Sequence, residues 1–408
     1  MKSNRSYPAV SVTDKGARFL RGGHVWVYED EVTDVSGSPQ DGEIVDVVSP
    51  KGRYLGSGFF NSRSKIRVRI LSKNANDRYD DAFFARRLGY ALDYRQTVMG
   101  GDFGCCRLIF GEADGFPGLT VDRFGDILVA QVLSLGMEQR KDMVFDTLVR
   151  LLRERGETIT ALCERNDVAL REKEGLAQCV GYYAGAGLRT DLDGTAPLVE
   201  NGIRYTVDYM RGQKTGFFLD QKYNRLAAAR LAKGKTVLDC FTHTGAFALN
   251  CAKAGAKRVT AVDISQDAVD LTAANAAQNG FANVDVLCAN VFDLLTELYE
   301  ANDRTYDYII LDPPAFTKSS ATVKNAMRGY KEINLKAMRL LPRGGYLATC
   351  SCSHFMTDDL FRQMLKSAAA DAGVTLRQIE ARQQSPDHPI LWNVPETEYL
   401  KFYLFQIE

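Results

Sequence analysis

Residues 236–265 read TVLDCFTHTGAFALNCAKAGAKRVTAVDIS, and this stretch decides the fold. Its first apolar run ends on Asp239, a turn of small residues follows, and 246–253 has the composition of a helix. Residues 258–262 start a second strand that ends on Asp263. This order predicts a β-strand, a crossover helix and a parallel β-strand, with both acids at the same edge of the sheet.

The turn between the two predicted strands favours a nucleoside ligand. Open α/β sheets bind ligands at the carboxyl ends of their strands, where an acid can accept hydrogen bonds from ribose hydroxyls. A dinucleotide-binding turn carries three spaced glycines, whereas this turn has Phe241, His243 and Thr244 and one glycine, Gly245. S-adenosylmethionine has no phosphate, so the looser turn suits it better. A βαβ unit without a ligand is the alternative.

The composition narrows the classes of protein to which the chain can belong. The chain has 408 residues, enough for two or three domains, and its 51 basic and 51 acidic residues give no net charge. Nucleic-acid binding would therefore depend on local clusters of basic residues. No signal peptide and no run of about 18 apolar residues is present, so we expect a cytoplasmic protein with no membrane partner. The nine cysteines include no Cys-x-x-Cys pair, and no metal site is expected.

The first 75 residues are predicted to form a small β-barrel. Its β segments, separated by turns rich in Gly, Asp, Ser and Pro, are expected at 25–27, 44–48, 54–60 and 66–71. Lys65, Arg67 and Arg69 alternate along the last segment and would share one face of a strand, which favours contacts with RNA phosphates. A solvated strand face is the alternative.

The remaining chain is predicted to form two further parts. Residues 80–97 have helical spacing, and a small α+β module is expected from 102 to about 183. From 199 onward, predicted strands alternate with helices, which predicts an α/β fold with a doubly wound, Rossmann-like sheet. The expected domains are the barrel at 1–75, the α+β domain with its linker helix at 76–190, and the Rossmann-like domain at 191–408.

Asp312-Pro313-Pro314 directly follows a predicted strand at 306–311. Two prolines cannot continue a strand, so they stiffen the backbone after Asp312 and direct groups into the crevice. One interpretation is that Asp312 or a backbone carbonyl binds the polar edge of a planar base while Phe316 lies against its face. Plain termination of the strand is the alternative.

Cys350 and Cys352 end the next predicted strand, 346–352. Alternation puts both thiols on the same side of the strand, with Cys352 nearer the crevice. A thiolate that adds to carbon 6 of a pyrimidine eases transfer of a methyl group to carbon 5, whereas nitrogen acceptors need no such help. Inert packing of both cysteines is the alternative.

Several motifs occur in a fixed order along the chain. They are Gly23-His24-Val25-Trp26-Val27-Tyr28, the segments at 41–47, 56–61 and 111–122, Phe217-Phe218-Leu219-Asp220-Gln221, the turn at 239–247, Asp312-Pro313-Pro314, Ser351-Cys352-Ser353 and Asp387-His388-Pro389. In this order they resemble the PUA-containing, S-adenosylmethionine-dependent 23S rRNA (cytosine-5)-methyltransferases of bacteria. The resemblance covers essentially the whole chain.

The resemblance implies a PUA-like RNA-binding barrel, a class I methyltransferase domain and S-adenosyl-L-methionine as the cofactor. The residues that match the family's cofactor site are Phe218, Gln221, Asp239, Thr244, Gly245, Asp263, Asn290 and Asp312. Within this set the resemblance makes Asp263 the acid that binds ribose. It puts Asn290 at the adenine edge, where many relatives have an acidic residue.

The resemblance also implies the catalytic groups. Cys352 lies seven residues after Gly345, as the family's nucleophile does, and Cys350 is the second choice. Asp312 is placed to hold the base. Two-cysteine relatives carry Pro-Cys where this chain has Pro313-Pro314, so the group that removes the carbon-5 proton stays unassigned.

The predicted function is methylation of carbon 5 of a cytosine in 23S rRNA, through an adduct of Cys352 at carbon 6. One alternative is methylation of a base nitrogen, because residues 312–316 also resemble the acid-Pro-Pro-aromatic motif of amine methyltransferases. Another is a non-catalytic RNA-binding assembly factor. The expected partner is rRNA of the large ribosomal subunit, and a homodimer is left open.

Overall fold

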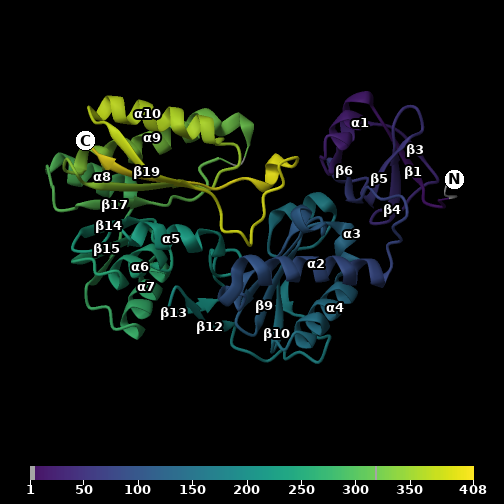
Figure 1. Ribbon diagram of the computed structural model, residues 1–408, viewed down its shortest axis with the longest axis horizontal. Helices are drawn as coiled ribbons and strands as arrows, with labels where there is room; N and C mark the ends of the chain where they lie inside the picture. Colours follow the sequence, from purple (N-terminus) through teal and green to yellow (C-terminus); the bar gives the residue numbers. More distant parts are fainter. Residues whose placement is uncertain (1–4, 318) are drawn as a thin grey trace. The chain divides into compact units, whose positions relative to one another are not determined.

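The computed structural model describes residues 5–317 and 319–408. The chain forms two compact units (Figure 1). We call the first the N-terminal unit; it contains the chain up to Leu198 together with Val207–Leu219 and Pro386–Thr397. The C-terminal unit contains Val199–Thr206, Asp220–Ser385 and Glu398–Glu408. The three expected domain ranges stay predictions.

The N-terminal unit begins with a six-stranded sheet in the order β2-β6-β5-β4-β1-β3. Its elements are β1 (Ala9–Val12), α1 (Asp14–Arg21), β2 (Trp26–Tyr28), β3 (Val32–Ser36), β4 (Ile44–Val48), β5 (Tyr54–Phe60) and β6 (Ile66–Ser72). The sequence pattern misses β1, α1 and β3. Four of the five residues of β3 are exposed, so it has no apolar run, and α1 buries only a narrow face that includes Ala17 and Leu20.

A second, five-stranded sheet in the order β11-β10-β9-β8-β7 follows in the same unit. Its elements are α2 (Asp81–Met99), β7 (Cys105–Phe110), β8 (Leu119–Phe124), β9 (Ile127–Val132), α3 (Leu135–Glu138), α4 (Lys141–Glu154), β10 (Ala161–Arg165) and β11 (Val180–Tyr182). Asp80 caps α2 by accepting a hydrogen bond from the backbone N–H of Phe83 at 3.0 Å. The segment at 111–122 includes the turn between β7 and β8 and most of β8. Next along the chain, β12 (Thr195–Glu200) and β13 (Ile203–Asp208) form a two-stranded sheet.

The C-terminal unit is built on a seven-stranded sheet in the order β16-β15-β14-β17-β18-β20-β19. Its elements are α5 (Lys222–Ala229), β14 (Thr236–Cys240), α6 (Ala246–Lys253), β15 (Arg258–Asp263), α7 (Gln266–Gln278), β16 (Val284–Cys288), α8 (Val291–Glu300), β17 (Tyr308–Leu311), α9 (Val323–Leu340), β18 (Tyr346–Ser351), α10 (Asp358–Ala372), β19 (Leu376–Arg382) and β20 (Lys401–Ile407). The five strands from β16 to β18 run parallel, and β20 is antiparallel to both of its neighbours.

Helices cover both faces of this sheet (Figure 1). Because side chains alternate along a strand, Leu238 packs into one core with residues of α8, α9 and α10, while Val237 packs into the other with residues of α5 and α6. The doubly wound sheet expected from the sequence is therefore confirmed. The strand order reverses at β14, between β15 and β17, which is the point where such sheets bind ligands.

Candidate functional site

The carboxyl ends of β14, β15 and β17 bring together three acids. Asp239 is the penultimate residue of β14, Asp263 is the last residue of β15, and Asp312 directly follows β17. The strands are parallel and hydrogen-bonded side by side, so the three carboxyls lie along one edge of the sheet. Within the described residues, none of the three carboxylates forms an ion pair.

Asp239 is fully buried, with 0% of its surface exposed. Its Oδ2 accepts hydrogen bonds from the hydroxyl of Thr242 at 2.6 Å and from the backbone N–H of Ala248 at 2.9 Å. Its Oδ1 has no hydrogen-bond partner among the described residues. Burial, together with the charge of Asp312, raises the pKa of the Asp239 carboxyl to about 7. A buried acceptor without a donor is costly unless a ligand supplies one.

The turn after β14 is held by Asp263. The Oδ2 of Asp263 accepts from the backbone N–H of His243 at 2.9 Å, and its Oδ1 accepts from that of Ser265 at 3.0 Å. Phe241 and His243 have φ values of 64° and 52°, a left-handed conformation that costs non-glycine residues energy. Backbone strain of this kind is concentrated at functional sites.

The turn requires glycine at position 245, both because of its backbone conformation and because a neighbouring side chain lies very close. Its φ is 81°, and a Cβ at this position would lie 2.6 Å from Cγ2 of Thr272. The neighbouring Thr244 is buried, and its carbonyl accepts a hydrogen bond from the side chain of Asn275 at 3.1 Å. The first turn of α6 is thereby packed against α7 without a side chain at Gly245.

A second group of predicted residues surrounds Asp312. The amide of the buried Gln221 donates to Oδ1 of Asp312 at 2.9 Å, and its carbonyl accepts from Asn224 at 2.6 Å. Burial raises the pKa of the Asp312 carboxyl to about 6, and the charge of Asp220 adds to the effect. Cys350 is fully buried next to Asp312 and Gln221. Burial raises the pKa of the Cys350 thiol well above its ordinary value, so this thiol is held in its unreactive form.

Cys352 differs from Cys350 in its access to solvent. It follows the last residue of β18 and is only partly buried. Its Sγ lies 3.9 Å from the carbonyl oxygen of Pro313, in the segment that also carries Asp312. The predicted nucleophile therefore lies against the segment that carries the predicted base-holding acid.

A buried lysine, missed by the sequence reasoning, lies beside Cys352. Lys401 is 5% exposed, and its Nζ donates to the carbonyl oxygens of Ser353 at 2.7 Å and Tyr399 at 2.8 Å. Burial lowers the pKa of the Lys401 ammonium to about 8, and the charge of Cys352 is the largest influence in the opposite direction. The only signal in the sequence is a single cation within the apolar run at 400–405.

Aromatic side chains stand next to the Asp312 segment. The ring of Phe316 lies 4.5 Å from that of Tyr330, 5.8 Å from Phe292 and 6.5 Å from Phe241, measured between centroids. The Tyr330 hydroxyl in turn contacts the hydroxyl of Ser353 at 3.0 Å. Phe316 is thus packed among other aromatic rings. It lies at the sheet edge where we predict that it contacts the face of a base.

Two further predicted cofactor residues make local contacts of their own. Asn290 is exposed and caps α8, since its Oδ1 accepts from the backbone N–H of Phe292 at 3.0 Å. Phe218 belongs to the N-terminal unit, where the Nζ of Lys214 lies 4.7 Å from its ring centroid. Their roles in cofactor binding stay predictions.

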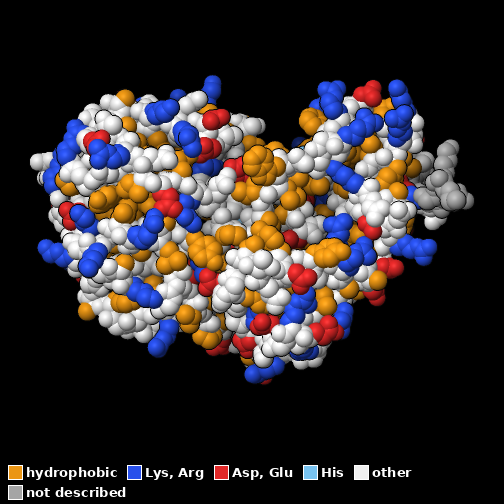
Figure 2. Space-filling model, in the orientation of Figure 1, with side chains coloured by type: hydrophobic (Ala, Val, Ile, Leu, Met, Phe, Trp, Pro, Cys, Tyr) orange, Lys and Arg blue, Asp and Glu red, His pale blue; other side chains and the backbone are white. Residues whose placement is uncertain are grey.

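The predicted RNA-binding residues differ in their exposure and in their ion pairs. Lys65 is exposed, whereas Arg67 pairs with Glu29 at 2.7 Å. Arg69 is partly buried between Glu112 and Glu174, at 3.0 Å from each. On the face shown in Figure 2, basic and acidic side chains are interspersed. RNA binding by these three residues stays a prediction.

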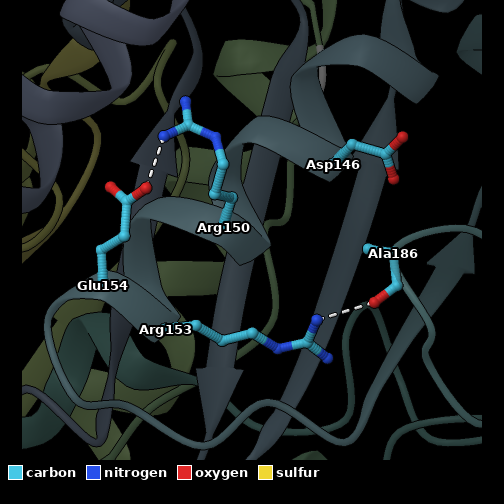
Figure 3. Close-up of a pocket in the computed structure, with 5 residues that line it drawn as sticks. All are labelled: Asp146, Arg150, Arg153, Glu154 and Ala186. Carbon is cyan, nitrogen blue, oxygen red and sulfur yellow. Dashed lines mark hydrogen bonds and ion pairs between the residues drawn. The ribbon is translucent and has the colours of Figure 1, made fainter.

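A hollow of about 460 Å³ lies over α4 in the N-terminal unit (Figure 3). Arg150 pairs with Glu154 at 2.7 Å there, and Arg153 donates to the carbonyl oxygen of Ala186 at 2.7 Å. These polar groups are bound to one another rather than directed at a common point, so the hollow has no mark of a ligand site.

The described part of the chain has neither a metal-binding cluster nor a membrane-spanning helix. Within residues 5–317 and 319–408, no three or more His, Cys, Asp or Glu side chains form a cluster that can hold a metal ion. Over the same ranges, no helix combines the length and the apolar character needed to cross a bilayer.

Two family models match the chain. A model described as a PUA-like domain matches residues 10–73, and one described as an S-adenosylmethionine-dependent methyltransferase matches residues 160–406. A solved structure from Streptococcus mutans, named as a candidate S-adenosylmethionine-dependent methyltransferase, superposes with a TM-score of 0.82 at 22% identity, over 98% of this chain and 99% of its own. The expected fold class is confirmed.

Relatives named ribosomal RNA large subunit methyltransferase I are similar to the chain over nearly its whole length. The relative from Aeromonas hydrophila subsp. hydrophila is 41% identical over 93% of this chain and 94% of its own length. The relative from Shewanella denitrificans is 42% identical over 94% of this chain and 95% of its own.

Proposed function

This chain belongs to the S-adenosylmethionine-dependent methyltransferase family, and we propose that it methylates carbon 5 of a cytosine in 23S rRNA. The names of its relatives support a ribosomal RNA of the large subunit as the substrate. The choice of cytosine carbon 5 is the finer part of the proposal. It depends on the thiol at the edge of the sheet.

The residues present fit S-adenosylmethionine. The buried Oδ1 of Asp239 lacks a donor among the described residues, and the turn that follows it holds Phe241 and His243 in a left-handed conformation. The three acids at this edge suit a positively charged ligand that also carries ribose hydroxyls. We assign Asp239, Gly245 and Asp263 to the cofactor, with Gln221 and Thr244 supporting them. When bound, the cofactor supplies an electrophilic methyl group.

Cys352 acts on the base in this proposal. Its thiolate forms a bond to carbon 6, and the electrons of the 5,6 double bond move to carbon 5, which accepts the methyl group. Loss of the carbon-5 proton then returns an electron pair to the ring, re-forms the double bond and expels the thiolate. Asp312, whose pKa is raised to about 6 mainly by burial, holds the polar edge of the cytosine.

One observation carries the proposal: Cys352 is partly exposed, with its Sγ 3.9 Å from the Pro313 carbonyl oxygen. A nucleophile has to reach its substrate as a thiolate. Cys350, in contrast, is fully buried, and its thiol pKa is raised well above the ordinary value. The difference between the two cysteines favours Cys352.

The test is nucleoside analysis of 23S rRNA from cells that lack the protein, restored with wild type, Cys352→Ala or Cys350→Ala. We expect 5-methylcytosine to be lost, to return with wild type and Cys350→Ala, and to stay absent with Cys352→Ala. Methylation by Cys352→Ala at the normal rate would contradict the covalent route. A missing nitrogen-methylated base instead would favour the alternative that residues 312–316 suggest.

A further inference from the structure

We propose that Lys401 is a positioning residue that favours the thiolate form of Cys352 and holds the segment that carries it. The inference rests on the proposed function in one respect, namely that Cys352 is the nucleophile. It concerns a residue in the last strand of the sheet. Nothing in the predicted mechanism uses this residue.

The geometry of two neighbouring strands fixes the position of Lys401. Lys401 pairs with Ser351 in the antiparallel register of β18 and β20, so it lies one residue away from Cys352. Its Nζ donates to the carbonyl oxygen of Ser353 at 2.7 Å, on the other side of Cys352. A second hydrogen bond, to the carbonyl oxygen of Tyr399 at 2.8 Å, fixes the orientation of the ammonium group.

The charges around Lys401 leave it without a carboxylate partner. Asp358 and Glu398 both face it, but Asp358 pairs with Arg362 at 2.7 Å and Glu398 accepts from Gln383 at 2.6 Å. Within residues 5–317 and 319–408, Lys401 forms no ion pair. A buried cation without a counter-ion is unfavourable, so an anion that forms nearby is stabilised by it.

Cys352 is the group that can become this anion. Of the groups facing Lys401, Cys352 opposes the burial-induced fall in the lysine pKa more strongly than Asp358 or Glu398 does. Tyr330 and Cys350 also interact electrostatically with Cys352, and both are neutral at pH 7 because burial raises their pKa values. Coulomb interaction is mutual, so the ammonium favours the thiolate.

The test measures the rate of alkylation of Cys352 by iodoacetamide between about pH 6 and 10, followed on the Cys352 peptide by mass spectrometry. Wild type is compared with Lys401→Met, Lys401→Gln and Lys401→Arg. We expect the pH at which the alkylation rate is half-maximal, its midpoint, to rise by about one pH unit in the two neutral variants and to stay near the wild-type value in the arginine variant. Lys366→Met, at an exposed lysine of α10, is the matched control and should change nothing.

The glutamine variant keeps donors for the two carbonyl oxygens, so it separates loss of charge from loss of packing. If both neutral variants keep the wild-type midpoint, the inference is wrong. Alkylation needs neither RNA nor cofactor, so this result is independent of the Cys352→Ala test. If the midpoint shifts but Cys352→Ala is active, Lys401 does favour the Cys352 thiolate and the proposed function is wrong. If the midpoint does not shift but Cys352→Ala is inactive, only the role of Lys401 is wrong.

Discussion

In the N-terminal unit the fully buried Arg95 is paired with Asp114, whereas in the C-terminal unit the equally buried Asp239 has no ion pair within the described residues. Arg95 Nη2 donates to Asp114 Oδ2 at 2.7 Å and to the carbonyl oxygen of Asp387 at 3.0 Å. Asp239 keeps one carboxylate oxygen without a donor. The buried cation has its counter-ion within the fold, whereas the buried acid is the group that we propose receives the cofactor.

If the proposed site is right, this contrast distinguishes a buried charge that stabilises the fold from one that binds a ligand. Removing one partner of a buried pair leaves the other uncompensated, so structural pairs should be costly to break. Neutralising a buried acid that has no counter-ion should instead raise the stability of the fold and weaken ligand binding.

The largest effect on stability is expected for Arg95→Met. It leaves Asp114 buried without its cation, and we expect the free energy of unfolding to fall by roughly 3–5 kcal/mol. Arg150→Met is the control, because the Arg150–Glu154 pair is more than half exposed on each side, and its loss should cost about 0–1 kcal/mol. Denaturant unfolding measures both. Equal losses in the two variants would remove the distinction between buried and exposed pairs.

Gly245→Ala tests the turn beneath Asp239. The new Cβ would meet Thr272 in a left-handed backbone, so we expect a loss of roughly 2–4 kcal/mol in unfolding free energy and weaker binding of S-adenosylmethionine. Gly344→Ala has a similar φ of 85° but nothing within 4 Å of the added Cβ. It should lose only the backbone cost, about 1–2 kcal/mol, and bind the cofactor normally. Normal cofactor affinity in a folded Gly245→Ala protein would contradict the role proposed for this turn in cofactor binding.

Asp239→Asn should stabilise the protein at neutral pH. The folded-state pKa is raised to about 7 by burial, so the folded protein binds this proton more tightly than the unfolded chain does. Stability contributed at this site is therefore present at low pH and lost as the pH rises from about 4 to 7. We expect the variant to exceed wild type by roughly 1–3 kcal/mol at pH 8 and to lose this advantage near pH 4. Denaturation at both pH values would show it, and a variant less stable than wild type at pH 8 would refute it.

Lys65→Ala should have the smallest effect on the fold. Lys65 is exposed, so the free energy of unfolding should change by less than about 0.5 kcal/mol. If its ammonium contacts a phosphate, the slope of log affinity for rRNA against log salt should fall by about one. Fluorescence anisotropy at several salt concentrations measures this slope. An unchanged slope would mean that Lys65 is simply a solvated residue.

Local patterns in the sequence predict the parts of the site that lie along one strand and its turn. Asp239 and Asp263 end predicted strands, so their place at the sheet edge follows from the topology of a βαβ unit. Partners far apart in the chain leave no such pattern. Arg69 meets Glu174, 105 residues away, and Lys401 reaches Ser353, 48 residues away, through the pairing of β18 with β20. Alternation places Cys350 and Cys352 on one side of a strand with Cys352 nearer the crevice, but the difference in their burial needed the fold.

The most direct test of the central claim is titration of S-adenosylmethionine by calorimetry, with wild type and Asp239→Asn, between about pH 6 and 8. If the unpaired carboxylate receives the cofactor, wild-type affinity rises with pH as Asp239 ionises. Affinity in the asparagine variant is then at least about tenfold weaker at pH 8 and nearly independent of pH. Equal affinity and equal pH dependence in the two proteins would contradict the account.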